Sequence, residues 1–353
     1  MSTIPTLNQI NPDGFHQSTD VPVKRRWIEF NTPEQCRNWD MPLNFKLVGD
    51  FHVTRGGITV IGGPPGLGKS RAALQLARAG ADQSSWFGHQ VHHRFKTLIL
   101  QNENGPHRLK ADFASFPAEY DESVLVTPPP EYGMRFDNEE FRDSLRSKLH
   151  EFKPGVIVID PFTNMVSDST QGDYSEAFDA IRDCLPSGED IPAIVIVAHT
   201  RKPKTPDKPQ GIELLHELLG SAKLGSMART AFVMQPATND TEDDRVIWTC
   251  CKNNDGEKGP RSVWVRKDSF FAPCIDFDWD EFENPPKGNE RITFNDMKGL
   301  FKNRICANRS TLVEELIECT GCGSSAAYNS LKLDGRFGKY LREGTGGLIS
   351  WTE

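Results

Sequence analysis

The chain has 353 residues, of which 37% are hydrophobic and 25% charged, and its formal net charge is −8. This length predicts two domains with short extensions. The composition excludes a general binder of polyanions, so that any contact with nucleic acid must come from local basic patches. Eight irregularly spaced cysteines indicate reduced thiols rather than a disulfide framework. The sequence lacks both an apolar run of the roughly 20 residues that span a bilayer and a secretory leader, so we expect a cytoplasmic protein without a membrane partner.

The first part of the chain is polar and predicts an N-terminal extension over residues 1–45, rich in Asn, Pro and Thr. We expect its first twenty or so residues to be poorly ordered, as chain termini commonly are. The apolar residues that follow, Trp27, Ile28 and Phe30, predict a segment that packs on the core.

Apolar strand patterns alternate with helical patterns from Ile58 to about Asp268. The strand candidates are Ile58–Ile61, Thr97–Leu100, Val124–Val126, Val156–Ile159, Ile194–Ala198, Phe232–Met234, Val246–Thr249 and Val263–Val265. Such strands predict an α/β domain, over residues 46–274, with a mostly parallel twisted sheet and helices on both faces. The last strands follow one another too closely for helices, which indicates an antiparallel extension with its turn in Asn253–Gly259.

An acidic stretch with Pro-Pro and Gly at its end, residues 275–290, predicts a linker to a second domain over residues 291–353. The second domain shows helical patterns at Phe294–Phe301, Thr311–Ile317 and Ser324–Leu331, followed by a hairpin around Gly344–Gly347. Three helices and a hairpin are typical of a winged helix-turn-helix domain that binds DNA. A small protein-contact domain of the same shape is the alternative.

The clearest motif is GPPGLGKS, which fits the phosphate-binding loop G-x-x-x-x-G-K-[ST]. A strand pattern precedes it, and a helical pattern with Gly80 as its expected stop signal follows. Glycines let consecutive backbone N–H groups turn toward phosphate oxygens, and the helix N-terminus adds positive charge. We therefore predict that ATP and Mg²⁺ bind here, with Lys69 on the β- and γ-phosphates and Ser70 on the metal. The predicted nucleotide-binding residues are Gly63, Pro64, Pro65, Gly66, Leu67, Gly68, Lys69, Ser70 and Arg71.

Two carboxylates follow predicted strands and are candidates for the chemistry. Asp160 ends the buried pattern VIVID, where an acid can hold the Mg²⁺ shell together with Ser70. Glu103 comes just after the strand Thr97–Leu100, where a carboxylate could orient the attacking water. The structural alternatives are a turn-capping Asp160 and a helix-capping Glu103.

The motifs IGGPPGLGKS, LILQNEN, VIVIDPF, IVIVAHTRKP, GSAKLGSMART and CKNNDG together resemble the RecA-like P-loop ATPase family, in its branch of RepA-type hexameric replicative helicases. The resemblance covers roughly residues 45–268. It implies a RecA-like core, ATP sites between neighbouring subunits of a ring, Glu103 as the catalytic carboxylate and Asp160 as the magnesium-shell acid. It also implies that His199 senses the γ-phosphate and relays its state to the adjacent loop.

The sequence departs from this family at a late strand, where Lys-x-Arg often projects into the ATP site of the neighbouring subunit. The matching residues are Lys252-Asn253-Asn254, so Lys252 is a trans-acting candidate and the arginine is absent. Such an arginine neutralises charge in the transition state. The candidates to replace it are Arg261, Arg229 and Lys258.

A basic loop after His199 predicts contacts with single-stranded DNA, because a flexible cationic segment neutralises phosphates without reading bases. Its candidate residues are Arg201, Lys202, Lys204 and Lys208. The alternative is an ordinary solvated loop.

The sequence thus predicts a DNA-associated ATPase, foremost a RepA-like ring helicase or a single-stranded DNA translocase. We expect a ring-shaped homo-oligomer, a hexamer by resemblance, with replication or recombination proteins as candidate partners. The alternatives are a non-motor ATP switch that assembles on DNA, as recombinases and their mediators do, and a regulatory ATPase with a protein-binding tail. A small-molecule P-loop kinase is least favoured, because no arginine-rich lid is evident and a second domain is present.

Overall fold

The computed structural model describes residues 30–162, 171–201, 209–218, 221–238, 240, 242–283 and 292–352. The chain divides into two compact units, Met1–Pro42 and Leu43–Glu353. None of the helices in the described part has the length and apolar character needed to cross a bilayer.

In the first unit, the expected packing of the N-terminal segment on the core stays a prediction. Phe30 is 88% exposed, while Trp27 and Ile28 lie outside the described residues. Among the described residues of this unit, helix α1 (Pro33–Arg37) has no buried residue. It is held instead by a local capping box, in which Thr32 and Gln35 bond to each other's backbone N–H.

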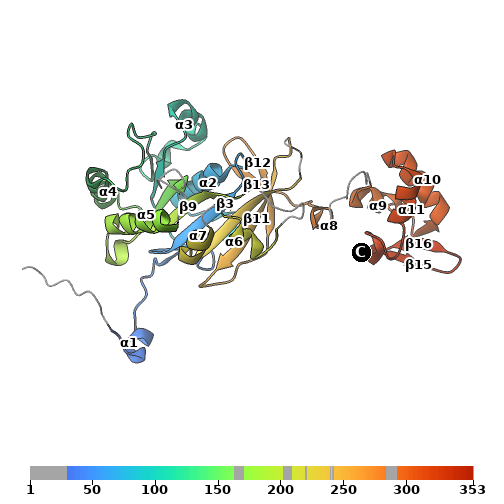
Figure 1. Ribbon diagram of the computed structural model, residues 1–353, viewed down its shortest axis with the longest axis horizontal. Helices are drawn as coiled ribbons and strands as arrows, with labels where there is room; N and C mark the ends of the chain where they lie inside the picture. The colour runs from blue at the N-terminus through green and yellow to red at the C-terminus, as the bar shows by residue number, and fades with distance from the viewer. Residues whose placement is uncertain are drawn as a thin grey trace, which may run out of the picture. The chain divides into compact units, whose positions relative to one another are not determined.

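The second unit is built on a nine-stranded sheet in the order β13-β12-β11-β10-β3-β9-β8-β6-β7. Strands β3, β9, β11, β12 and β13 of this sheet are labelled in Figure 1. Neighbours from β10 to β7 run parallel, and β11, β12 and β13 continue the sheet antiparallel. The strands are β3 (Ile58–Gly63), β6 (Thr97–Gln101), β7 (Val124–Val126), β8 (Val156–Asp160), β9 (Ala193–His199), β10 (Thr230–Pro236), β11 (Arg245–Asn253), β12 (Ser262–Arg266) and β13 (Phe271–Pro273). The predicted mostly parallel sheet with an antiparallel extension is confirmed.

Helices cover both faces of this sheet, as the near-continuous apolar strands predict. They are α2 (Lys69–Asp82), α3 (Pro106–Phe113), α4 (Glu139–Phe152), α5 (Gln171–Cys184), α6 (Glu213–His216), α7 (Ser221–Met227) and α8 (Trp279–Glu283). On one face, Ile157 and Ile159 pack in a cluster with residues of α4 to α7. On the other, Val156 and Val158 pack in a cluster with residues of α2. Alternate side chains of β8 therefore enter opposite cores, which the period of two in a strand requires.

The sequence did not predict two short hairpins near this sheet. They pair β1 (Lys46–Val48) with β2 (Val53–Thr54), and β4 (Ser85–Trp86) with β5 (His89–Gln90). Strands of two or three residues are too short for a periodic pattern to reveal them. The described residues near this sheet also form the 3₁₀ turns η1 (Ala118–Tyr120) and η3 (Gly188–Asp190).

The C-terminal part contains the three helices and the hairpin that the sequence predicts. Its elements are α9 (Phe294–Leu300), β14 (Cys306–Asn308), α10 (Arg309–Thr320), α11 (Ser324–Ser330), the 3₁₀ turn η4 (Gly338–Tyr340), β15 (Leu341–Glu343) and β16 (Leu348–Trp351). The unexpected β14 joins the hairpin in a three-stranded sheet, β14-β16-β15, and the part has a hydrophobic core of its own. The winged-helix assignment stays a prediction.

The expected stop of helix α2 at Gly80 is wrong, because the helix continues to Asp82 and is capped by Gln83 in a left-handed conformation. Gly80 serves packing instead. A Cβ at this position would lie 2.1 Å from Cε2 of Phe95, whose ring fills the space against the helix. Only a residue without a side chain fits there.

We predict that Gly80→Ala destabilises the protein by about 1–3 kcal/mol, the usual cost of overpacking a core, despite the better helix propensity of alanine. Urea unfolding measures the effect. The matched control is Gly225→Ala in α7, where a Cβ would meet only Leu215 at an ordinary 3.5 Å. Equal unfolding midpoints for the two variants would contradict this account of Gly80.

Candidate active site

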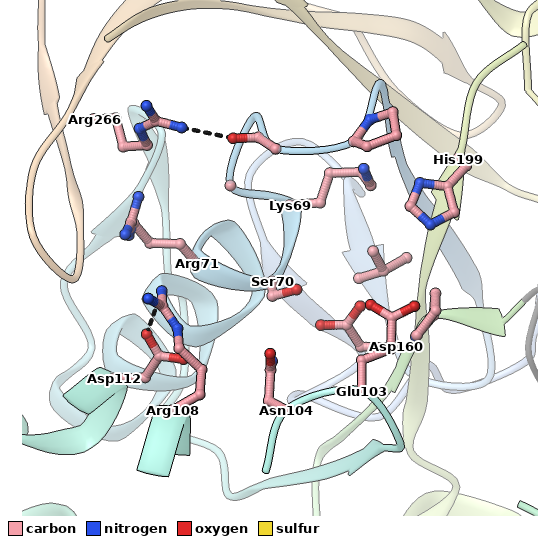
Figure 2. Close-up of a pocket in the computed structure, with 15 residues that line it drawn as sticks. Lys69, Ser70, Arg71, Glu103, Asn104, Arg108, Asp112, Asp160, His199 and Arg266 are labelled. Carbon is pink, nitrogen blue, oxygen red and sulfur yellow. Dashed lines mark hydrogen bonds and ion pairs between the residues drawn. The ribbon is translucent and has the colours of Figure 1, made fainter. Parts of the chain in front are cut away.

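A pocket of about 650 Å³ lies where the carboxyl ends of β3, β9, β8 and β6 meet (Figure 2). The parallel registers align Gly63 with His199, and Gln101 with Asp160. The connection after β3 leads to α2 on one face of the sheet, and the connection after β9 leads to α6 and α7 on the other face. A crevice forms where the connections of neighbouring strands go to opposite faces. The pocket is lined by Pro65, Gly66, Gly68, Lys69, Ser70, Arg71, Glu103, Asn104, Arg108, Asp112, Asp160, Pro161, Val197, His199 and Arg266.

The loop between β3 and α2 has the backbone that phosphate binding requires. Gly66 and Gly68 have φ angles of 81° and 90°, in the left-handed region that glycine adopts without strain. Helix α2 begins at Lys69, and no side chain caps its N-terminus. The amides of its first turn and the positive end of its dipole are therefore available to an anion. Lys69 Nζ donates a hydrogen bond to the Pro64 carbonyl 2.8 Å away, within the same loop.

Burial disfavours the charged forms of Lys69 and Asp160, the two central ionisable groups of the pocket. It lowers the pKa of Lys69 to about 8, against the attraction of Asp160 and Glu103. It raises the pKa of Asp160 to about 6, although a hydrogen bond from the Ser70 side chain acts in the other direction. Desolvation outweighs the attraction between these opposite charges. A ligand of opposite charge would therefore stabilise the charged form of each side chain. A divalent cation at Asp160 and a phosphate at Lys69 would supply such partners, so the residues fit magnesium and a triphosphate.

The loop after β6 places Glu103 beside Asp160 (Figure 2). The buried Gln101 side chain fixes this loop, because its Oε1 accepts the backbone N–H groups of Glu103 and Asn104 at 3.2 and 2.7 Å. Its Nε2 donates to the carbonyls of Asn104 and Thr127 at 3.0 and 2.6 Å. Glu103 is thus presented to the pocket by a fully hydrogen-bonded amide.

His199 ends β9 on the side of the pocket where Lys69 lies (Figure 2). Burial lowers its pKa, the charge of Lys69 lowers it further, and Glu103 opposes both. The ring is therefore neutral at pH 7. Its Nδ1 is buried and has no hydrogen-bond partner among the described residues. A neutral ring with a vacant nitrogen can accept or donate a single hydrogen bond as its ligand changes.

Four polar residues of the pocket escaped the sequence analysis: Asn104, Arg108, Asp112 and Arg266. Arg108 and Asp112 form a salt bridge of 2.7 Å, and their spacing of four in a helical pattern was a usable signal. Arg266 lies some 200 residues after the loop, and no local pattern connects the two. Arg71, which the sequence did predict, has a buried Nε without a partner among the described residues.

The remaining predicted residues lie elsewhere. Lys252 is near the end of β11, and its Nζ donates to the Gly225 carbonyl at 2.7 Å. Both arginines considered as substitutes are also paired within the chain, Arg229 with Asp255 and Arg261 with Glu283. Of the basic loop, the structure describes only the exposed Arg201, whereas Lys202, Lys204 and Lys208 fall outside the described residues.

Sequence comparison identifies one family. A sequence model described as "AAA domain" matches residues 20–205, which is more than half of the chain and includes the loop, Glu103, Asp160 and His199. None of the curated proteins matches the sequence significantly.

Two solved structures illustrate the structural likeness. The RadB recombinase has 13% sequence identity and a TM-score of 0.43, with 62% of this chain and 90% of that chain covered. A KaiC-like protein from the hyperthermophilic archaeon Pyrococcus horikoshii OT3 has 12% identity and a TM-score of 0.45, with 66% and 99% covered. Similarity at this level says nothing about activity.

We predict that Asp160→Asn stabilises the nucleotide- and metal-free protein at pH 7.5. The folded-state pKa of about 6 exceeds the ordinary 3.8, so the stability associated with protonated Asp160 is complete below pH 4 and is lost as the pH rises through about 6. Asparagine avoids this loss, which amounts to roughly 1–3 kcal/mol. Urea unfolding at pH 4 and pH 7.5 tests the prediction. A difference between the two proteins that does not grow with pH would contradict it.

Proposed function

Because the chain belongs to the AAA domain family and carries a glycine loop at the edge of a mostly parallel sheet, we propose that it is a RecA-like, magnesium-dependent ATPase that works on DNA. The observation that carries the ATPase proposal is the convergence, at one edge of the sheet, of a glycine loop, a buried lysine and two carboxylates. These groups match the needs of phosphoryl transfer, which depends on positioning and on stabilising negative charge.

Each residue has a distinct role in the proposed reaction. The loop amides and Lys69 hold the triphosphate, because the dipole of α2 and the ammonium both attract negative charge. Ser70 and Asp160 would hold Mg²⁺, which neutralises charge on the phosphates when bound. Glu103 orients the attacking water and takes its proton, since its loop is fixed by Gln101. His199, with its vacant Nδ1, registers the presence of the γ-phosphate.

The proposed link to DNA starts at His199. Arg201 follows it by two residues, and its backbone N–H donates to the Glu217 carbonyl at 2.7 Å. A change at His199 would reach Arg201 through the intervening Thr200, and Arg201 stands at the start of the basic sequence that contains Lys202, Lys204 and Lys208. We propose that this segment binds the phosphates of single-stranded DNA in a ring helicase or translocase, and that the C-terminal part adds a second DNA contact.

A non-motor ATP switch on DNA is the second candidate, and the partners of the cations favour it. In a ring, Lys252 would act on the ATP site of the neighbouring subunit. Its Nζ is bonded to Gly225, and Arg229 and Arg261 are paired with carboxylates of their own chain. Weak stabilisation of the transition state by a neighbour would give slow hydrolysis, which suits a switch better than a motor.

We predict that Lys69→Ala weakens ATP binding and abolishes turnover, whereas Glu103→Gln retains binding and lowers kcat by about 100-fold or more, because it removes only the base. Calorimetry with ATP and a phosphate-release assay separate the two effects. Turnover that survives Lys69→Ala would reject the site. Weakened binding in Glu103→Gln would reject the proposed role of that carboxylate.

We predict further that single-stranded DNA raises kcat for ATP, and that rising salt cancels this effect because the contacts are to phosphates. Unwinding of a forked duplex distinguishes the two candidates, since a motor separates the strands and a switch does not. Glu103→Gln serves as the hydrolysis-deficient control. An ATPase rate that does not change with DNA would exclude both the motor and the DNA switch. The regulatory ATPase with a protein-binding tail would then remain.

A further inference from the structure

An arginine from the antiparallel extension bonds to the phosphate-binding loop of its own chain. Arg266, the last residue of β12, donates from Nη1 to the Gly66 carbonyl at 2.6 Å (Figure 2). Gly66 is one of the two loop glycines in the left-handed region. A loop that points its N–H groups toward phosphate must leave carbonyls without backbone partners, and Arg266 provides a charged donor for one of them.

The guanidinium of Arg266 is itself fixed. Its Nε and Nη2 donate to Oδ1 of Asp244 at 2.9 and 2.6 Å, and its backbone N–H donates to the Asp244 carbonyl at 2.8 Å. Asp244 immediately precedes β11, which pairs with β12 in the sheet. The side chain therefore reaches the loop from a rigid element, and Arg266 makes two side-chain bonds and one backbone bond to Asp244.

The hairpin of β12 and β13 also packs on Gly68, the second loop glycine in the left-handed region. A Cβ at Gly68 would lie 2.9 Å from Cζ of Phe271, the first residue of β13, and 3.6 Å from Cδ of Arg266. Phe271 is 3% exposed and exchanges backbone hydrogen bonds with the Gln75 side chain of α2, at 2.9 Å through its N–H and 3.5 Å through its carbonyl. Strands β12 and β13 thus contact both ends of the turn that precedes Lys69.

We propose that Arg266, held by Asp244, is a positioning residue that acts in cis: it keeps the Gly66 peptide turned so that the loop amides face the triphosphate, and it adds positive charge at the pocket wall. The proposal rests on the proposed ATPase function. It gives the antiparallel extension a role in nucleotide binding. Arg266 also differs from a cation that a neighbouring subunit supplies, because it contacts the phosphate-binding loop of its own chain.

The effect of Arg266 falls on binding rather than on the chemical step, because its contact exists before any phosphate bond changes. Arg266→Ala removes a charge-assisted hydrogen bond and should raise the Kd and KM for ATP by about 10- to 50-fold. The value of kcat should stay within about threefold. Arg266→Lys keeps the charge without the fork and should recover part of the affinity, and Asp244→Asn should fall between wild type and Arg266→Ala.

The matched control is Arg245→Ala. Arg245 pairs with Asp243 next to Asp244 through two similar bonds, of 2.9 Å each, but does not line the pocket. We measure the Kd for ATP by calorimetry, kcat and KM by phosphate release, and the urea midpoint of every variant. Affinity lost in Arg266→Ala but not in Arg245→Ala, at similar midpoints, supports the proposal. A Kd that stays within threefold of wild type, or a loss confined to kcat, would overturn it.

Mixing Arg266→Ala chains with Lys69→Ala chains, at ATP concentrations below the raised KM of Arg266→Ala, tests whether the residue acts in cis. If Arg266 served a neighbouring subunit, Lys69→Ala chains would restore activity to Arg266→Ala chains by supplying the missing arginine. The proposal expects no restoration, and recovered turnover would reject it. Lys69→Ala alone distinguishes failure of the proposed ATPase function from failure of the Arg266 inference. If Lys69→Ala leaves ATP binding intact, the proposed ATPase function is wrong. If only the Arg266 variants bind normally, the function stands and this inference fails.

Discussion

The parallel pairing of four strands is the constraint on which the rest of the structure depends. Strands β3, β9, β8 and β6 all run in the same direction, so their carboxyl ends lie along one edge of the sheet. Each end carries one part of the site: the loop with Lys69, then His199, Asp160 and finally Glu103. A slip of one residue in any of these strands would turn its apolar residues toward the wrong core, so the cores on both faces fix the positions of these side chains.

The electrostatics of the site follow from that burial. The packed cores that fix the strands also remove Lys69 and Asp160 from water. Burial lowers the pKa of Lys69 and raises that of Asp160, so the neutral form of each is favoured. In the structure Lys69 bonds to the Pro64 carbonyl, and His199 and Arg71 each have a buried nitrogen without a partner among the described residues. A site that leaves several donors and charges incompletely compensated binds a highly charged ligand strongly, because the ligand completes the hydrogen bonds and neutralises the charges.

Most of the sheet and more than half of the residues that line the pocket could be predicted from the sequence, because their signals are local. The strands of the central sheet are continuous apolar runs, and the loop motif, Asp160 and Glu103 each stand at a strand end. What escaped prediction depends on contacts between distant segments. Gly80 was interpreted as a helix stop, although its role is set by the ring of Phe95. Arg266 looked like any strand-end arginine, because only the pairing of β12 with β11 brings it to Gly66.

The central claim is that the Gly63–Ser70 loop binds a triphosphate together with Mg²⁺, and a crystal structure with a non-hydrolysable ATP analogue and Mg²⁺ tests it most directly. The account predicts phosphates surrounded by the loop amides, Lys69 Nζ moved from the Pro64 carbonyl to a phosphate oxygen, and the metal beside Ser70 and Asp160. A nucleotide bound elsewhere on the chain, or a Lys69 that still bonds to Pro64 beside a bound triphosphate, would contradict it.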